Sequence, residues 1–203
     1  SLLFDSGYKI GAALVQHPHI RAVGFTGSFR GGRALMDLAN ARHEPIPVYA
    51  EMGSANPVFI LPQALDQRAE QLATGLHGSF TLGGGQFCTK PGLVFVPQAP
   101  SPAFSAKIQA LTKEGPAFSL LTGGIASLYG KQVADRATLK TAEGASADAG
   151  FTAQTALLET TYATFESDPA LAEEVFGPTT LLIHCSTTSQ MLAAARSLEG
   201  HLT

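Results

Sequence analysis

The sequence has 203 residues, of which 45% are hydrophobic and 14% are charged, with a formal net charge of −3. That charge argues against nucleic acid or an anionic membrane surface as a partner, and the length suits one large domain or two modest ones. The two cysteines, Cys88 and Cys185, are too few for a disulfide framework. Apolar runs fall far short of the roughly 20 residues of a membrane span. We therefore expect a globular protein of the cytoplasm.

The chain begins with a predicted helix over residues 4–16, whose apolar side chains recur at helical spacing. His17-Pro18 ends this helix, because the residue before a proline avoids the α conformation. His17 and His19 flank the proline without a third ligand nearby, so we expect no metal site.

A short apolar strand over residues 20–26 leads into Gly27 and Ser28, and a second helix is expected over residues 33–39. Strand, glycine turn and helix is an arrangement that directs the free N–H groups of a helix start at a phosphate. The spacing is not G-x-G-x-x-G, so an ordinary strand-to-helix turn is the alternative.

Glu51 follows a second predicted strand over residues 45–50 and precedes a loop that contains Gly53. A carboxylate at the carboxyl end of a strand is well placed for catalysis in an open α/β sheet. The alternative is a solvated loop glutamate, which is the more common fate of this residue type.

Further short strands and helices alternate along the rest of the chain, a pattern typical of α/β proteins. Strands are expected over residues 58–61, 93–97, 153–161 and 179–185, the third of them exposed or at a sheet edge. Helices are expected over residues 66–80, 103–112, 125–137, 168–174 and 189–198, and a loop over residues 141–150.

Cys88 lies in a glycine-rich stretch, residues 83–92, that predicts neither helix nor strand. Three glycines precede the cysteine and Pro91-Gly92 follow it, so the chain is free to turn sharply there. Such a loop can present a sulfur and its own backbone N–H outward, as a nucleophile and an oxyanion donor require. The alternative is a small buried residue beside a tight turn.

Four motifs, in this order, resemble those of the aldehyde dehydrogenase family. They are Phe25-Thr26-Gly27-Ser28 with Gly32, Glu51-Met52-Gly53, Gly85-Gln86-Phe87-Cys88 and Glu174-Val175-Phe176-Gly177-Pro178. The resemblance covers essentially the whole chain. The finer pattern around Glu51 and Cys88 is most similar to the 2-oxoglutarate semialdehyde (2,5-dioxopentanoate) dehydrogenase branch.

The resemblance implies oxidation of an aldehyde to a carboxylic acid with NAD or NADP, both of which stay open as the cofactor. Cys88 would attack the aldehyde, here 2-oxoglutarate semialdehyde, and a thioester would follow. Glu51 would be the general base that activates water for hydrolysis of that thioester. Residues 1–53 would be the end of a Rossmann-like NAD(P)-binding domain, and residues 54–203 most of the α/β catalytic domain, truncated at its C-terminus.

The resemblance also implies cofactor contacts. Gly27, Ser28 and Gly32 would lie at the pyrophosphate, Glu174 would bind the nicotinamide ribose, and Phe176 would pack near the ring. No metal is implied.

We interpret the chain as an internal fragment of a longer protein that forms a homo-oligomer, and we expect the fragment alone to be inactive. Family positions outside these residues include an oxyanion asparagine and a cofactor-binding lysine. Two other hypotheses stay open. One is a cofactor-independent esterase or acyl-transfer enzyme that uses Cys88, and the other is a non-catalytic family member.

Overall fold

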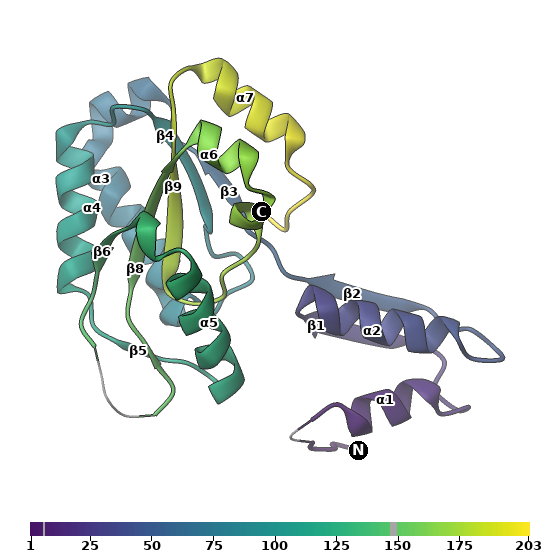
Figure 1. The fold of residues 1–203 in the computed structure, drawn as a ribbon. Coiled ribbons are helices and arrows are strands. Elements are labelled where there is room, and N and C mark those ends of the chain that lie inside the picture. The colour runs from purple at the N-terminus through teal and green to yellow at the C-terminus, as the bar shows by residue number, and fades with distance from the viewer. Residues whose placement is uncertain (6, 147–149) are drawn as a thin grey trace. The chain divides into compact units, whose positions relative to one another are not determined.

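The computed structural model describes residues 1–5, 7–146 and 150–203, and the chain forms two compact units (Figure 1). The first unit spans Ser1–Gly53 and the second spans Ser54–Thr203. Both combine helices with parallel strands, which gives the α/β class expected from the alternating pattern. No helix of the described residues is long and apolar enough to cross a membrane.

The first unit is a two-stranded parallel sheet with two helices. Its elements are α1 (Lys9–Gln16), β1 (Val23–Gly27), α2 (Phe29–Asn40) and β2 (Val48–Met52). The strands pair in parallel from Val23 with Val48 to Gly27 with Met52. A small core joins Val15 of α1, Ala39 of α2 and Ile46. The two helices thus pack on the strands through one apolar cluster, and α2 starts four residues earlier than expected.

The second unit is built on a five-stranded sheet in the order β3-β4-β9-β8-β6. The strands are β3 (Pro57–Phe59), β4 (Leu93–Pro97), β6 (Lys140–Glu143), β8 (Ala156–Thr161) and β9 (Thr179–Cys185). The first four in this order are parallel, and β6 is antiparallel to β8. The central strands β4 and β9 are buried along nearly their whole length because helices cover both faces of the sheet.

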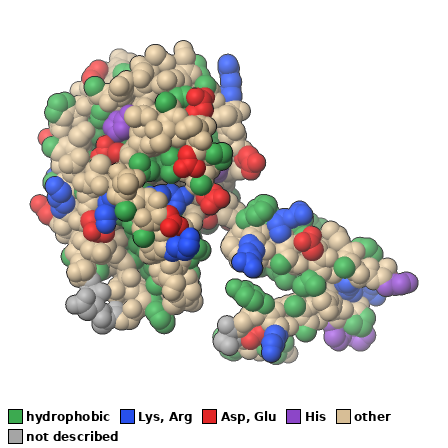
Figure 2. All heavy atoms as spheres, in the orientation of Figure 1, with side chains coloured by type: hydrophobic (Ala, Val, Ile, Leu, Met, Phe, Trp, Pro, Cys, Tyr) green, Lys and Arg blue, Asp and Glu red, His purple; other side chains and the backbone are tan. Residues whose placement is uncertain are grey.

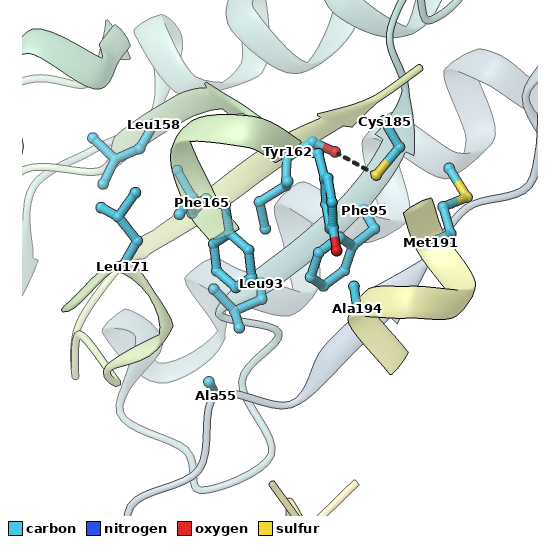
Figure 3. Packing of buried hydrophobic residues seen from close by; sticks show 12 residues of the cluster. Ala55, Leu93, Phe95, Leu158, Tyr162, Phe165, Leu171, Cys185, Met191 and Ala194 are labelled. Atoms are coloured by element: carbon cyan, nitrogen blue, oxygen red, sulfur yellow. Dashed lines mark hydrogen bonds between the residues drawn. The ribbon is translucent and has the colours of Figure 1, made fainter. Parts of the chain in front are cut away.

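Alternate side chains of the central strands enter two different cores. Leu93 and Phe95 point into a cluster with α6 (Tyr162–Ser167) and α7 (Thr188–Ser197). Figure 3 shows Phe95 beside Phe165 in this cluster, and their ring centroids lie 5.5 Å apart in an edge-on contact. The Phe95 ring also stacks on Phe59, with ring centroids 4.7 Å apart. Val94 and Val96 point the other way, toward α3 (Pro62–Thr81) and α4 (Pro102–Glu114). The sheet is therefore the middle layer of three (Figure 1).

The second unit also contains elements outside the five-stranded sheet and its four covering helices. They are α5 (Gly123–Asp135), the antiparallel pair β5 (Phe118–Ser119) and β7 (Thr152–Ala153), and 3₁₀ turns at Leu82–Gly85, Ala137–Leu139 and Pro169–Ala172. On the face of the second unit seen in Figure 2, acidic and basic side chains lie interspersed. This mixture agrees with the small net charge.

Three sequence-based predictions of secondary structure were wrong. The strand expected at an edge is β8, which lies inside the sheet between β9 and β6. Part of the expected loop 141–150 is β6, which supplies the edge instead, while residues 147–149 lie outside the described part of the chain. The helix expected over 168–174 is only a 3₁₀ turn capped by Asp168, because Gly177-Pro178 must already lead into β9. Polar residues in β6 and β8 concealed their pairing.

Candidate active site

The amino ends of parallel strands in the second unit bring together the segments around Cys88 and Glu174. Asn56 directly precedes β3, Pro91-Gly92 precede β4, and Gly177-Pro178 precede β9. Backbone hydrogen bonds join these segments, because Gly92 N–H donates to Ala55 O at 2.8 Å and Leu181 N–H donates to Gly92 O at 3.0 Å. The predicted nucleophile and the predicted ribose-binding carboxylate therefore belong to segments at the same end of one sheet, where its parallel strands begin.

The glycines before Cys88 are required by the backbone. Gly83, Gly84 and Gly85 have φ values of 59°, 69° and 67°, a left-handed conformation that residues with a Cβ adopt at a cost. A Cβ on Gly85 would also overlap the carbonyl of Gly177. The glycine run thus makes a tight left-handed turn that packs directly against the segment before β9.

Cys88 is exposed, in a turn closed by the Lys90 N–H, which donates to Phe87 O at 3.1 Å. The Asn56 side-chain amide donates to Cys88 O at 2.8 Å and to Lys90 O at 2.9 Å. Asn56 is itself only 2% exposed, with a left-handed φ of 44°. A buried side chain therefore holds the backbone of the thiol loop, and the exposure of Cys88 contradicts the alternative of a small buried residue beside a turn.

Asn56 is held in turn by its neighbours. Its Oδ1 accepts from the Ser54 hydroxyl at 2.6 Å and from the Thr203 N–H at 3.1 Å. The Ser54 hydroxyl oxygen also accepts from the Leu202 N–H at 2.9 Å. Because both the donors and the acceptor of the Asn56 amide are used, its orientation is fixed.

Gln86 ties the other side of the loop to the chain around β5. Its Nε2 donates to Gly83 O at 3.0 Å and to Ser119 O at 3.3 Å, and its Oε1 accepts from the Leu121 N–H at 2.8 Å. The glutamine of the predicted nucleophile motif is therefore a structural clamp on the loop.

Glu174 is half-buried beside a fully buried lysine. Burial raises the pKa of Glu174, and the Lys90 charge and a hydrogen bond from the Ser54 backbone N–H offset part of that increase. Burial lowers the pKa of Lys90 to about 8, against the opposing effect of Glu174. The Lys90 ammonium donates to Thr179 O at 2.9 Å. Sequence reasoning gave Lys90 no role.

The segment that follows Glu174 is fixed by α5. Gln132 donates to Glu174 O at 3.0 Å, and the Tyr129 hydroxyl donates to Pro178 O at 3.4 Å. The Tyr129 ring covers Gly177, where a Cβ would overlap it. Phe176, predicted to pack near the nicotinamide, is half-buried on this fixed segment.

The other predicted site residues belong to the first unit. Gly27 ends β1, and the Ser28 hydroxyl caps α2 by accepting from the Gly31 N–H at 3.1 Å. Gly32 faces Met52 so closely that a Cβ would overlap its sulfur. Glu51 is exposed on β2, paired with Thr26 of β1. These residues share the carboxyl ends of two strands and the start of a helix, the usual place for a nucleotide phosphate in such folds.

Comparisons with known proteins agree with this architecture. A family model described as "Aldehyde dehydrogenase family" matches residues 1–202, and the chain therefore belongs to the aldehyde dehydrogenase family.

Similar proteins include alpha-ketoglutaric semialdehyde dehydrogenase 2 of Azospirillum brasilense, which is 46% identical over 100% of this chain and 40% of its own length. The alpha-ketoglutaric semialdehyde dehydrogenase of Acinetobacter baylyi is 38% identical over 97% of this chain and 39% of its own length. The chain thus spans about 40% of the length of these relatives.

A solved gamma-glutamyl-gamma-aminobutyraldehyde dehydrogenase from Burkholderia cenocepacia shares the fold. Its TM-score is 0.79 at 20% identity, over 93% of this chain and 40% of that one.

Proposed function

We propose that this chain carries the thiol site and part of the cofactor site of an NAD(P)-dependent dehydrogenase that oxidises 2-oxoglutarate semialdehyde to 2-oxoglutarate. The observation that carries the proposal is the exposed Cys88 on a loop clamped by Asn56 and Gln86. This loop lies at the same end of the sheet as Glu174, where the parallel strands begin. The substrate follows from the relatives at 46% and 38% identity, whose names state that aldehyde.

Cys88 is the proposed nucleophile. Its thiolate adds to the aldehyde carbon, forming a carbon–sulfur bond, and the carbonyl oxygen becomes an oxyanion that the Cys88 backbone N–H can stabilise. The nicotinamide cofactor, when bound, would accept the hydride, a hydrogen with its two electrons, that the former aldehyde carbon loses as its C–H bond breaks. The acyl group then stays on Cys88 as a thioester. Glu51, the proposed general base, takes a proton from the water that hydrolyses this thioester, which releases the acid and the free thiol.

The residues of the first unit fit a dinucleotide pyrophosphate. The start of α2 supplies free backbone N–H groups, and Gly32 lets α2 pack closely on Met52 of β2. We propose that Gly27, Ser28 and Gly32 hold the pyrophosphate through these groups.

In the second unit, Glu174 offers a carboxylate that can accept hydrogen bonds from ribose hydroxyls. Phe176, on the same fixed segment, offers an apolar surface for the nicotinamide ring. NAD and NADP both fit this set of residues.

Because the relatives are longer, we propose that full activity needs residues beyond these 203, and that the full-length protein forms a homo-oligomer. We further propose a location in the cytoplasm, where two free thiols persist.

The proposal is tested by adding 2-oxoglutarate semialdehyde with NAD or NADP and following the absorbance of the reduced nicotinamide, with Cys88→Ala as the control. In a protein as long as the relatives, we expect turnover that the substitution abolishes, and little or none in the 203-residue chain. Turnover that survives Cys88→Ala would refute the role of the thiol. Ester hydrolysis at Cys88 without any nicotinamide reduction would favour a cofactor-independent acyl-transfer enzyme.

A further inference from the structure

Lys90 is a buried cation that the proposed mechanism does not use. Its residue is 2% exposed, two positions after the proposed nucleophile. An ammonium has three donors, and the Thr179 carbonyl at 2.9 Å accepts from one of them. A carbonyl alone does not compensate for removing a full charge from water, so a countercharge is needed nearby.

Glu174 is an acidic group whose charge acts on Lys90, because it raises the pKa of the ammonium against the effect of burial. Both residues line a small cavity of about 20 Å³, together with Arg136 and Glu173. The Arg136 guanidinium is turned to backbone acceptors, the carbonyls of Gln132 at 3.1 Å and Ala170 at 2.6 Å. The cavity has room for one water molecule, which can accept from the Lys90 ammonium and donate to the Glu174 carboxylate.

Hydrogen bonds also connect Ser54, which lies beside Glu174, with the thiol loop. The Ser54 backbone N–H helps to lower the pKa of Glu174, and the Ser54 hydroxyl donates to Asn56 Oδ1. The Asn56 amide then donates to the carbonyls of both Cys88 and Lys90. Lys90 is thus joined to the Cys88 loop through its backbone and lines the same small cavity as Glu174.

We propose that Lys90 is a positioning residue that ties the Glu174 carboxylate to the loop of Cys88. Coupling between two sites is reciprocal. A ligand that binds Glu174 therefore changes the position and reactivity of the Cys88 thiol, and a reaction at Cys88 changes the affinity of Glu174 for that ligand. The ligand in question rests on the proposed function, in which Glu174 binds the cofactor ribose.

The two side chains should depend on each other in a double-mutant cycle. Glu174→Gln leaves the buried ammonium without its countercharge, and Lys90→Met leaves the half-buried carboxylate without its own. The double variant removes both charges, so its effect should be smaller than the sum of the single effects. Lys131→Met is a matched control, since Lys131 forms an exposed ion pair with Asp135 at 2.8 Å.

The experiment measures urea unfolding and the rate of Cys88 alkylation by iodoacetamide for these variants of the 203-residue chain, at pH 6.5 and pH 9.5. At pH 6.5 we expect Glu174→Gln to change the alkylation rate by at least about twofold in the wild-type background and by much less in Lys90→Met. The coupling should weaken at pH 9.5, where most of Lys90 is neutral, whereas a role in packing alone would be insensitive to pH. Lys131→Met should leave both readouts unchanged.

Additive single effects at both pH values would overturn the proposal, as would a coupling that is equal at both. If Lys90→Met does not fold, Lys90→Gln replaces it and retains a donor for the Thr179 carbonyl. The cycle uses neither aldehyde nor cofactor. Coupling without any turnover in the full-length protein would therefore refute only the proposed function, and turnover with an additive cycle would refute only this inference.

Discussion

Lys90→Met should abolish a pH dependence of stability that the wild-type chain shows. Burial lowers the pKa of Lys90 from 10.5 to about 8. In the window between these values the unfolded chain holds a proton that the folded chain has lost, so the free energy of unfolding rises with pH. Below pH 8 the folded chain carries the full cost of burying the ammonium.

The size of this effect follows from the lowered pKa. At about 1.4 kcal/mol per pKa unit, the buried ammonium destabilises the folded chain by about 3 kcal/mol at pH 7, and about 2 kcal/mol of this is recovered by pH 9.5. Burial also raises the pKa of Tyr129, and raises that of Cys185 to about 11, so these groups reduce stability at alkaline pH. Both are present in the wild type and the variant, and their contributions cancel in the comparison.

The assay is urea unfolding followed by circular dichroism, since the chain has no tryptophan. We expect the wild type to gain about 2 kcal/mol relative to Lys90→Met between pH 7 and pH 9.5. An identical pH dependence in the two proteins would show that Lys90 is not buried as a cation, and would refute the reasoning.

Three further substitutions test the packing of the site. Asn56→Gly keeps the left-handed backbone but removes both side-chain donors to the thiol loop. It should lower the free energy of unfolding in urea by about 2–4 kcal/mol and alter the rate of Cys88 alkylation. An unchanged alkylation rate would show that the Asn56 side chain does not position the thiol. Gly85→Ala places a methyl group against the Gly177 carbonyl at a φ of 67°. A thermal melt should show a free energy of unfolding lower by about 2–4 kcal/mol. Wild-type stability in this variant would contradict the geometry of the glycine turn. Ser28→Ala removes the cap of α2 and should lower stability by about 1 kcal/mol, followed as the loss of helical signal from the first unit on heating. Ser28→Asn can still cap the helix, so an equal loss of stability in that variant would argue against the capping role.

The central strands were predictable and the edge of the sheet was not. β4 and β9 were predicted with the bounds that the structure shows, because strands buried on both faces contain runs of consecutive apolar residues, here 93–96 and 181–183. β6 reads Lys-Thr-Ala-Glu, and its pairing with β8 depends on partners distant in sequence. Local patterns carry no information about such partners.

The candidate site divides in the same way. The glycine loop and the exposure of Cys88 were predicted, since glycine and proline act on the backbone locally. The roles of Asn56 and Lys90 were missed. A lysine is rarely buried, so nothing in the sequence signalled that Lys90 would be. For Asn56 a signal existed, because asparagine before proline at a strand entry tolerates left-handed backbone.

Peptide-mapped alkylation with iodoacetamide tests whether Cys88 is an available nucleophile in the folded chain. Cys185 is an internal control, because it is 2% exposed in the sheet and burial raises its pKa to about 11. We expect the label on Cys88 alone in the folded chain, and on both cysteines once urea unfolds it. A folded chain in which Cys88 is as protected as Cys185 would contradict the account.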